Sequence, residues 1–232
     1  MLVFFAFLLC LTWGSVSTLF WIPERELGRG YFQMNALVVL GLLSLAVVSR
    51  WLHPFEPFGE QPATGALALH IGYAGAFLYY GAVWRESWRW VRWPAALMLL
   101  ALGWALWEIT GPLVAKGAAL PAILPLGAFA LFTSALLLGW SLITMLLGHW
   151  YLISPKLDFR HLTLFSWALL ALVGLRLVSF GASLWAAATA SYAAEPTAWR
   201  LLTSFEGEAM FFWVRMLWGL AGPLLLGLMA LH

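Results

Sequence analysis

Arg176 is the residue of this chain that most strongly suggests a chemical role, because it is a charged residue in the middle of a long apolar run, in the segment GLRLV (174–178). Near the centre of a bilayer an arginine costs at least ~2.5 kcal/mol, so it must face protein or water and have a partner. One interpretation is that it binds a haem propionate, a quinone carbonyl or a lipid phosphate. The other is a structural bond to a carboxylate or a main-chain carbonyl of a neighbouring helix.

A second arginine, Arg215, lies near the start of the last apolar run, 209–231. At the α-helical rise per residue, its Cα lies roughly 9 Å below the nearer membrane face. From that depth the side chain can reach the headgroups or pair with Glu108, which lies at the end of another apolar run. A lipid headgroup or a cofactor is again the functional interpretation.

Two histidines lie inside apolar runs. His70 has Tyr73 and Phe77 on its side of a helix, whereas small residues at positions 68, 72 and 76 form a seam on the opposite side that favours close helix packing. His149 lies near the end of another run. Each histidine suits either a polar contact between helices or a hydrogen bond to a quinone headgroup.

The positions of the histidines argue against a haem b that this chain holds alone. Ligation by two histidines needs both on neighbouring helices at one depth. Only His149 and His161 share a depth, and we expect His161 at the water interface. We expect no metal site and no catalytic residue. The candidate residues for binding a quinone, a haem propionate or a lipid headgroup are His70, Tyr73, His149, Arg176 and Arg215.

The composition of the 232-residue chain limits its function. It is 63% hydrophobic and 9% charged, whereas a soluble domain carries about 25% charged residues. This balance excludes a soluble enzyme, a disordered chain and a nucleic-acid-binding protein. The single cysteine, Cys10, excludes an internal disulfide and a cysteine-ligated iron–sulfur cluster. The absence of lysine from every apolar run excludes a retinal Schiff base.

Helices must position these residues, because apolar runs this long are typical of membrane-spanning helices, each about 20 residues long. We predict an all-α, polytopic transmembrane helix bundle with about seven spans. It would be a single integral-membrane domain, 1–232, with no soluble domain. The predicted spans are 2–21, 34–52, 63–84, 94–109, 126–151, 162–188 and 209–231, and the fourth either ends at 109 or continues toward Lys116.

The basic residues between these spans predict the orientation. Alternate connections carry seven of them, namely Arg25, Arg29, Arg85, Arg89, Arg92, Lys156 and Arg160. The other connections carry three, namely Arg50, Lys116 and Arg200. By the positive-inside rule the first group lies in the cytoplasm, so the N-terminus is outside and the C-terminus is cytoplasmic.

Two connections have distinctive compositions. Segment 84–93 combines arginines and tryptophans and predicts a short interfacial helix, which serves as a topology anchor or binds a specific lipid or partner. Segment 191–208 is acidic. It predicts either an interfacial helix or a surface that meets a basic partner such as a small cytochrome c.

Three short segments carry a resemblance to a known group of proteins. They are GRGYFQMN (28–35), LGHWYLISP (147–155) and FFWVRMLWGLAGP (211–223). With its length and span count, the chain resembles bacterial polytopic proteins encoded alongside respiratory electron-transfer subunits. It looks most like the accessory membrane subunit of thermophile bc-type quinol–cytochrome c reductases. The resemblance implies no catalytic residues for this chain.

These observations favour a non-catalytic integral-membrane subunit of a respiratory electron-transfer complex in the bacterial cytoplasmic (inner) membrane. It would buttress a cytochrome b-like partner, meet cytochrome c and membrane lipids, and line a quinone or lipid site. Quinone, haem b or phospholipid would then bind at an interface with a partner chain. One alternative is a haem b or quinone-binding membrane oxidoreductase in its own right. Another is a small-anion transporter with Arg176 as the anion site.

Overall fold

The computed structural model describes residues 2–22, 24–52, 64–115, 124–154 and 159–194. Within these ranges every regular element is a helix, which confirms the all-α prediction. The helices are α1 (Leu2–Thr18), α2 (Glu24–Leu27), α3 (Arg29–Leu52), α4 (Thr64–Trp84), α5 (Trp88–Ala115), α6 (Leu124–Ile153) and α7 (Arg160–Ala194). The six long helices correspond to the first six predicted spans. The seventh, 209–231, lies outside the described residues.

Five of the described helices, α3 to α7, are long and apolar enough to cross a membrane. They indicate an integral membrane protein. The remaining long helix, α1, has 17 residues and ends at Thr18, three residues before the predicted end. Its length is therefore about 26 Å, short of the roughly 30 Å of a bilayer core.

Several predicted boundaries differ from the structure. Helix α5 begins six residues before the predicted span 94–109, so Pro94 lies inside it instead of starting it, and its end at Ala115 agrees with the alternative in which this span continues toward Lys116. The predicted separate interfacial helix 84–93 is absent, because the chain reverses within residues 85–87 and then continues directly as α5. Glu86 adopts a positive φ of 57° in this turn. Helix α7 has 35 residues and continues past the predicted end at residue 188.

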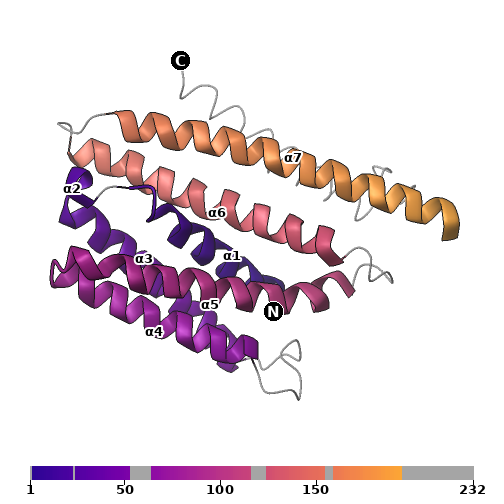
Figure 1. Cartoon of the computed structure of the whole chain (residues 1–232), viewed down its shortest axis with the longest axis horizontal. Coiled ribbons are helices and arrows are strands. Elements are labelled where there is room, and N and C mark those ends of the chain that lie inside the picture. Colours follow the sequence, from indigo (N-terminus) through magenta and orange to yellow (C-terminus); the bar gives the residue numbers. More distant parts are fainter. Residues whose placement is uncertain (1, 23, 53–63, 116–123, 155–158, 195–232) are drawn as a thin grey trace.

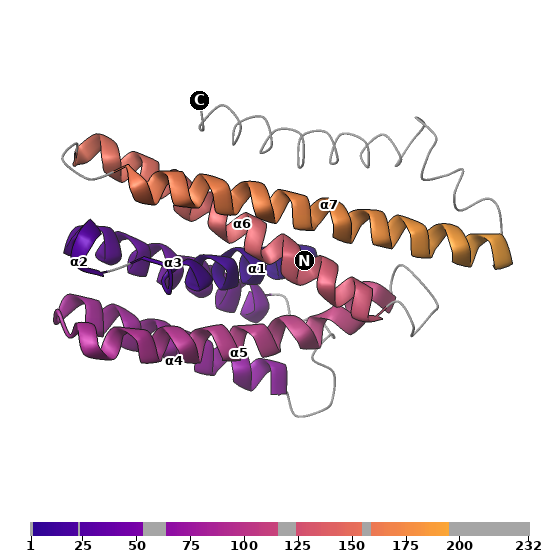
Figure 2. The same ribbon diagram turned by 45° about the horizontal axis from the view of Figure 1, so that its top comes forward.

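Helix α1 is the centre of the bundle. It packs against α3, α5 and α6, whereas α4 and α7 lie at opposite edges, α4 beside α5 and α7 beside α6 (Figures 1 and 2). Ten of the 17 residues of α1 are buried. A helix that is apolar on all sides is suited to this central position.

Glycines allow α1 and α6 to touch through their backbones. A Cβ added at Gly14 of α1 would lie 2.8 Å from the carbonyl carbon of Ala135 and 3.0 Å from the Cα of Gly139, both on α6. The predicted small-residue seam on α4 is confirmed, because residues 68, 72 and 76 are buried. A Cβ added at Gly72 would lie 2.7 Å from Leu102 of α5.

Tryptophan indoles join helices elsewhere in the core. The indole N–H of Trp13 on α1 donates to the Leu99 carbonyl of α5 at 2.9 Å. The indole N–H of Trp140 on α6 donates to the Ser17 hydroxyl of α1 at 2.9 Å. These bonds use the polar edge of an otherwise apolar side chain, so they join helices without placing a charge in the core.

We call one end of the bundle the basic end. It holds α2, the α4–α5 turn and the first turn of α7 (Figure 1, left), and its basic residues include Arg29, Arg85, Arg89, Arg92 and Arg160. Three contacts between helices tie this end together. They are Arg29 with Glu86, Trp150 with the Leu27 carbonyl, and His161 with Glu26.

Candidate functional site

Arg176 lies on α7 and faces the bundle. Its guanidinium Nη1 donates to the main-chain carbonyl of Ala130 on α6 at 2.8 Å. That carbonyl also accepts hydrogen bonds from the hydroxyls of Ser134 at 2.8 Å and Thr133 at 3.1 Å. The charge is thus placed between α7 and α6.

The sequence allowed two interpretations of Arg176, ligand binding or a structural bond to a neighbouring helix. The bond to the Ala130 carbonyl is of the second kind. Its chemical role here is to connect α7 to α6 with a charge-assisted hydrogen bond, which is stronger than a neutral one. The two hydroxyls make this turn of α6 a polar patch in an apolar helix. Arg176 therefore has a structural function whether or not it also binds a ligand.

His70 lies in the second turn of α4, on the outward side of the bundle, where its side chain is exposed. Its Nδ1 is 2.6 Å from the Ala66 carbonyl. Because a carbonyl oxygen only accepts, Nδ1 must carry the proton in this contact. In the neutral ring Nε2 then holds the lone pair, and it is available to a donor outside the helix.

Tyr73 follows one turn after His70 but points to a different neighbour. Its hydroxyl lies 3.1 Å from the Ser44 hydroxyl of α3, and its ring contacts Phe77 edge-on with centroids 5.0 Å apart. Tyr73 is half-buried between α3 and α4. The hydroxyl of Tyr73 therefore joins two helices, while His70 faces away from the bundle.

His149 is exposed near the end of α6, close to the basic end. His70 is near the opposite end, on α4, which lies across the bundle from α6 (Figure 2). The structure therefore does not bring His70, His149 and Arg176 into one site. His161 lies at the end of the bundle as expected, but it is only 7% exposed, and its Nε2 contacts the Glu26 carboxylate of α2.

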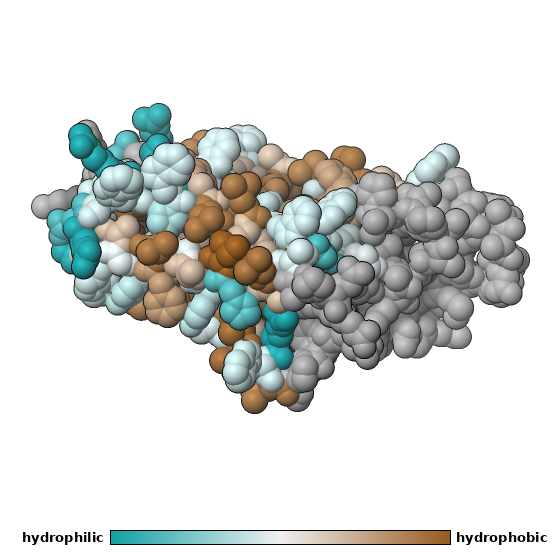
Figure 3. All heavy atoms as spheres, turned by 60° about the horizontal axis from the view of Figure 1, so that its bottom comes forward, coloured by the Kyte–Doolittle hydropathy of each residue, from teal (hydrophilic) through white to brown (hydrophobic). Residues whose placement is uncertain are grey.

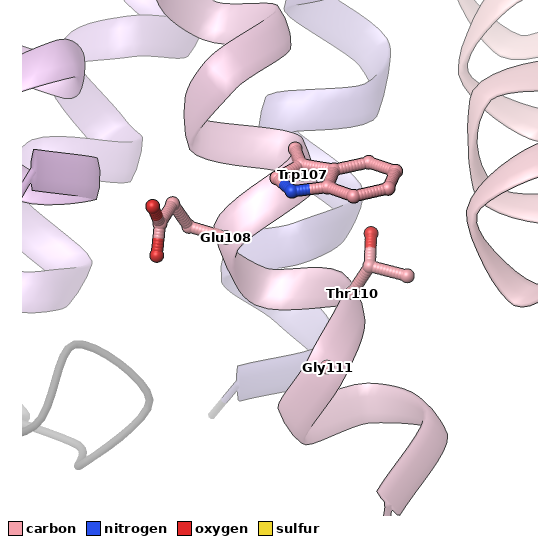
Figure 4. A pocket seen from close by; sticks show the side chains of 4 residues that line it. All are labelled: Trp107, Glu108, Thr110 and Gly111. Carbon is pink, nitrogen blue, oxygen red and sulfur yellow. The ribbon is translucent and has the colours of Figure 1, made fainter. Parts of the chain in front are cut away.

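Arg215 lies outside the described residues, and so does its predicted pair with Glu108. The Glu108 carboxylate accepts a hydrogen bond from the Thr64 hydroxyl at 3.0 Å, which ties the start of α4 to α5. Glu108 also lines a cavity of about 180 Å³ with Trp107, Thr110 and Gly111. Trp107 and Glu108 point to opposite sides of α5 (Figure 4), and all four residues that line the cavity belong to this one helix.

A buried polar pair on α3 was not identified from the sequence. Tyr31 and Asn35 lie one turn apart, are 0% exposed, and interact with each other. Within the described ranges, neither the Tyr31 hydroxyl nor either polar atom of the Asn35 amide has a partner in hydrogen-bonding geometry. The sequence feature that could have identified this pair is Asn35, the only asparagine of the chain, at the start of an apolar run.

Comparison of the chain with protein families, curated proteins and solved structures finds no match.

Proposed function

We propose that this chain is a non-catalytic integral-membrane subunit of a respiratory electron-transfer complex, a bc-type quinol–cytochrome c reductase or a similar assembly. In this proposal it lies in the bacterial cytoplasmic membrane and buttresses a cytochrome b-like subunit. The excess of arginine at the basic end favours the cytoplasm for that end. The N-terminus would then be outside and the C-terminus cytoplasmic.

The exposure of His70 is the observation that carries the proposal. His70 lies within a helix able to span a membrane, and its exposed neighbours include Leu67 and Ile71. A polar ring that faces lipid alone is unfavourable, because hydrocarbon offers Nε2 no donor. A polar group from a partner subunit supplies that donor, so this face of α4 suits an interface between proteins in the membrane.

A quinol headgroup is a second candidate for the same position. A quinol hydroxyl is a donor, and the Nε2 lone pair of His70 faces outward to accept it. The apolar side chains around His70 suit the isoprenoid tail of such a molecule. Under this alternative the chain lines one wall of a quinone site, as a subunit or as an oxidoreductase in its own right.

A pull-down of the tagged full chain from native membranes in mild detergent tests the assembly. We expect it to bring down b-type haem, detected by the Soret band. His70→Phe keeps the ring size but removes the acceptor, so we expect at least a threefold loss of co-purified haem. His70→Gln retains an acceptor and serves as the matched control. Isolation of the wild-type chain without any cytochrome, in undiminished yield, would contradict the proposed function.

A further inference from the structure

The α4–α5 turn gathers positive charge on the surface of the basic end. Arg85 lies in the turn and Arg89 lies at the start of α5, and both side chains are exposed. Arg92 follows one turn later and is exposed as well. Strongly hydrophilic side chains gather at this end of the molecule, whereas apolar side chains are common along the middle (Figure 3). The turn therefore presents a local excess of arginine to the membrane face.

The acidic residue of this turn does not cancel that charge. Glu86 forms an ion pair with Arg29 at the start of α3. Arg29 also donates to the Trp84 carbonyl at 3.1 Å, which fixes it against the end of α4. Glu86 is compensated by Arg29, and within the part of the chain that the structure describes no carboxylate pairs with Arg85 or Arg89, so their charges can serve a ligand outside the protein.

The tryptophans indicate the depth of the turn in the membrane. Trp84, Trp90 and Trp93 are all exposed, and Trp93 is 71% exposed. Exposed tryptophans at the end of a membrane helix are typical of the interface between headgroups and hydrocarbon. Since the turn lies at the ends of two helices able to span a membrane, Arg85 and Arg89 are at the level of the lipid phosphates.

An apolar stripe continues from Arg89 down the outer side of α5. Trp93, Leu97 and Leu100 follow at helical spacing on that side, and all three are exposed. Leu100 is 75% exposed. A positive site above a long apolar stripe matches a phospholipid, whose phosphate is joined to acyl chains, better than it matches a free anion.

We propose that Arg85 and Arg89 bind the phosphate of an anionic phospholipid, with one acyl chain along Trp93, Leu97 and Leu100. Each arginine near a membrane surface favours anionic lipid by about fivefold. A headgroup with net negative charge, such as phosphatidylglycerol, is therefore selected over zwitterionic phosphatidylcholine. Arg92 adds to the positive electrostatic potential at this site.

Native mass spectrometry of the delipidated full chain, titrated with each lipid, tests this proposal. We expect the wild-type chain to bind phosphatidylglycerol at least fivefold more tightly than phosphatidylcholine. The double variant Arg85→Gln/Arg89→Gln should lose this preference. Arg160→Gln, which removes one charge from the same end of the bundle but on α7, is the control and should keep it. Far-UV circular dichroism checks that each variant is folded.

Three results would overturn the proposal. One is an equal affinity of the wild-type chain for the two lipids, which needs no variant to fold. Another is a loss of the phosphatidylglycerol preference in Arg160→Gln as large as the loss in the double variant. That result would indicate a diffuse electrostatic attraction instead of a binding site at Arg85 and Arg89. The third is full competition by millimolar inorganic phosphate, which would show a site for free anions.

Discussion

Neither α1 nor α7 is amphipathic, yet the two helices have opposite positions in the molecule. Ten of 17 residues of α1 are buried, by three neighbouring helices. On α7, whose side chains are described to residue 185 with few exceptions, only five residues are buried, and α6 is its main neighbour. The sequence pattern does not show which helix is central, because neither helix has separate apolar and polar sides, and lipid and protein interior are both apolar. The contacts of their glycines do differ, because Gly14 of α1 touches the backbone of α6 whereas no atom lies within 4 Å of a Cβ added at Gly174 of α7.

The glycine contact of α1 provides the strongest test of this comparison. Gly14→Leu would drive a side chain into the backbone of α6, and we expect a destabilisation of about 3 kcal/mol or more. Gly174→Leu on α7 is the matched control, because no atom lies within 4 Å of a Cβ added there. Unfolding of the purified chain in detergent, followed by far-UV circular dichroism, measures both. Equal losses in the two variants would remove the distinction between the helices.

Arg176 tests the attachment of α7. Arg176→Leu removes the bond to the Ala130 carbonyl, and we expect the chain to lose about 2 kcal/mol of stability. Arg176→Lys retains a charged donor and should lose less. The same unfolding assay applies. A leucine variant as stable as the wild type would show that packing alone holds α7.

Substitution of two valines, one on α1 and one on α7, should change stability least, and it compares the two helices at residues of the same type. Val16 of α1 is 0% exposed, whereas Val178 of α7 is 65% exposed. We expect Val16→Ala to cost about 1 kcal/mol through lost packing. Val178→Ala should change stability by less than ~0.5 kcal/mol, since lipid replaces the lost contact. If Val178→Ala proves as costly as Val16→Ala in the purified chain, its face of α7 is covered by protein.

The sequence was sufficient to predict helices wherever apolar residues run continuously, and it located the small-residue seam of α4. It placed His70, Tyr73, His149 and Arg176 on the correct helices because depth follows directly from residue count. It did not predict the contact of Gly14 with Gly139, or the contact of His161 with Glu26. Both join segments far apart in the chain, and local periodicity contains no information about such pairs.

The tryptophans show a second reason for the incomplete prediction. Trp13 and Trp140 donate hydrogen bonds between helices, whereas Trp90 and Trp93 are exposed near the membrane face. Composition alone treats all four alike. Their different roles depend on which carbonyl or hydroxyl lies nearby, and that depends on helix packing.

The central position of α1 has a consequence for biosynthesis. The indole bond between Ser17 and Trp140 joins residues 123 positions apart. At common translation rates, about 6 to 25 s pass before the ribosome has made the second of these residues. During that interval the nascent α1 lies in the translocon or in lipid. Its serine and threonine hydroxyls then form hydrogen bonds only within their own helix. The packing around this central helix is thus completed only after α6 has been synthesised, when α1 is already in the membrane.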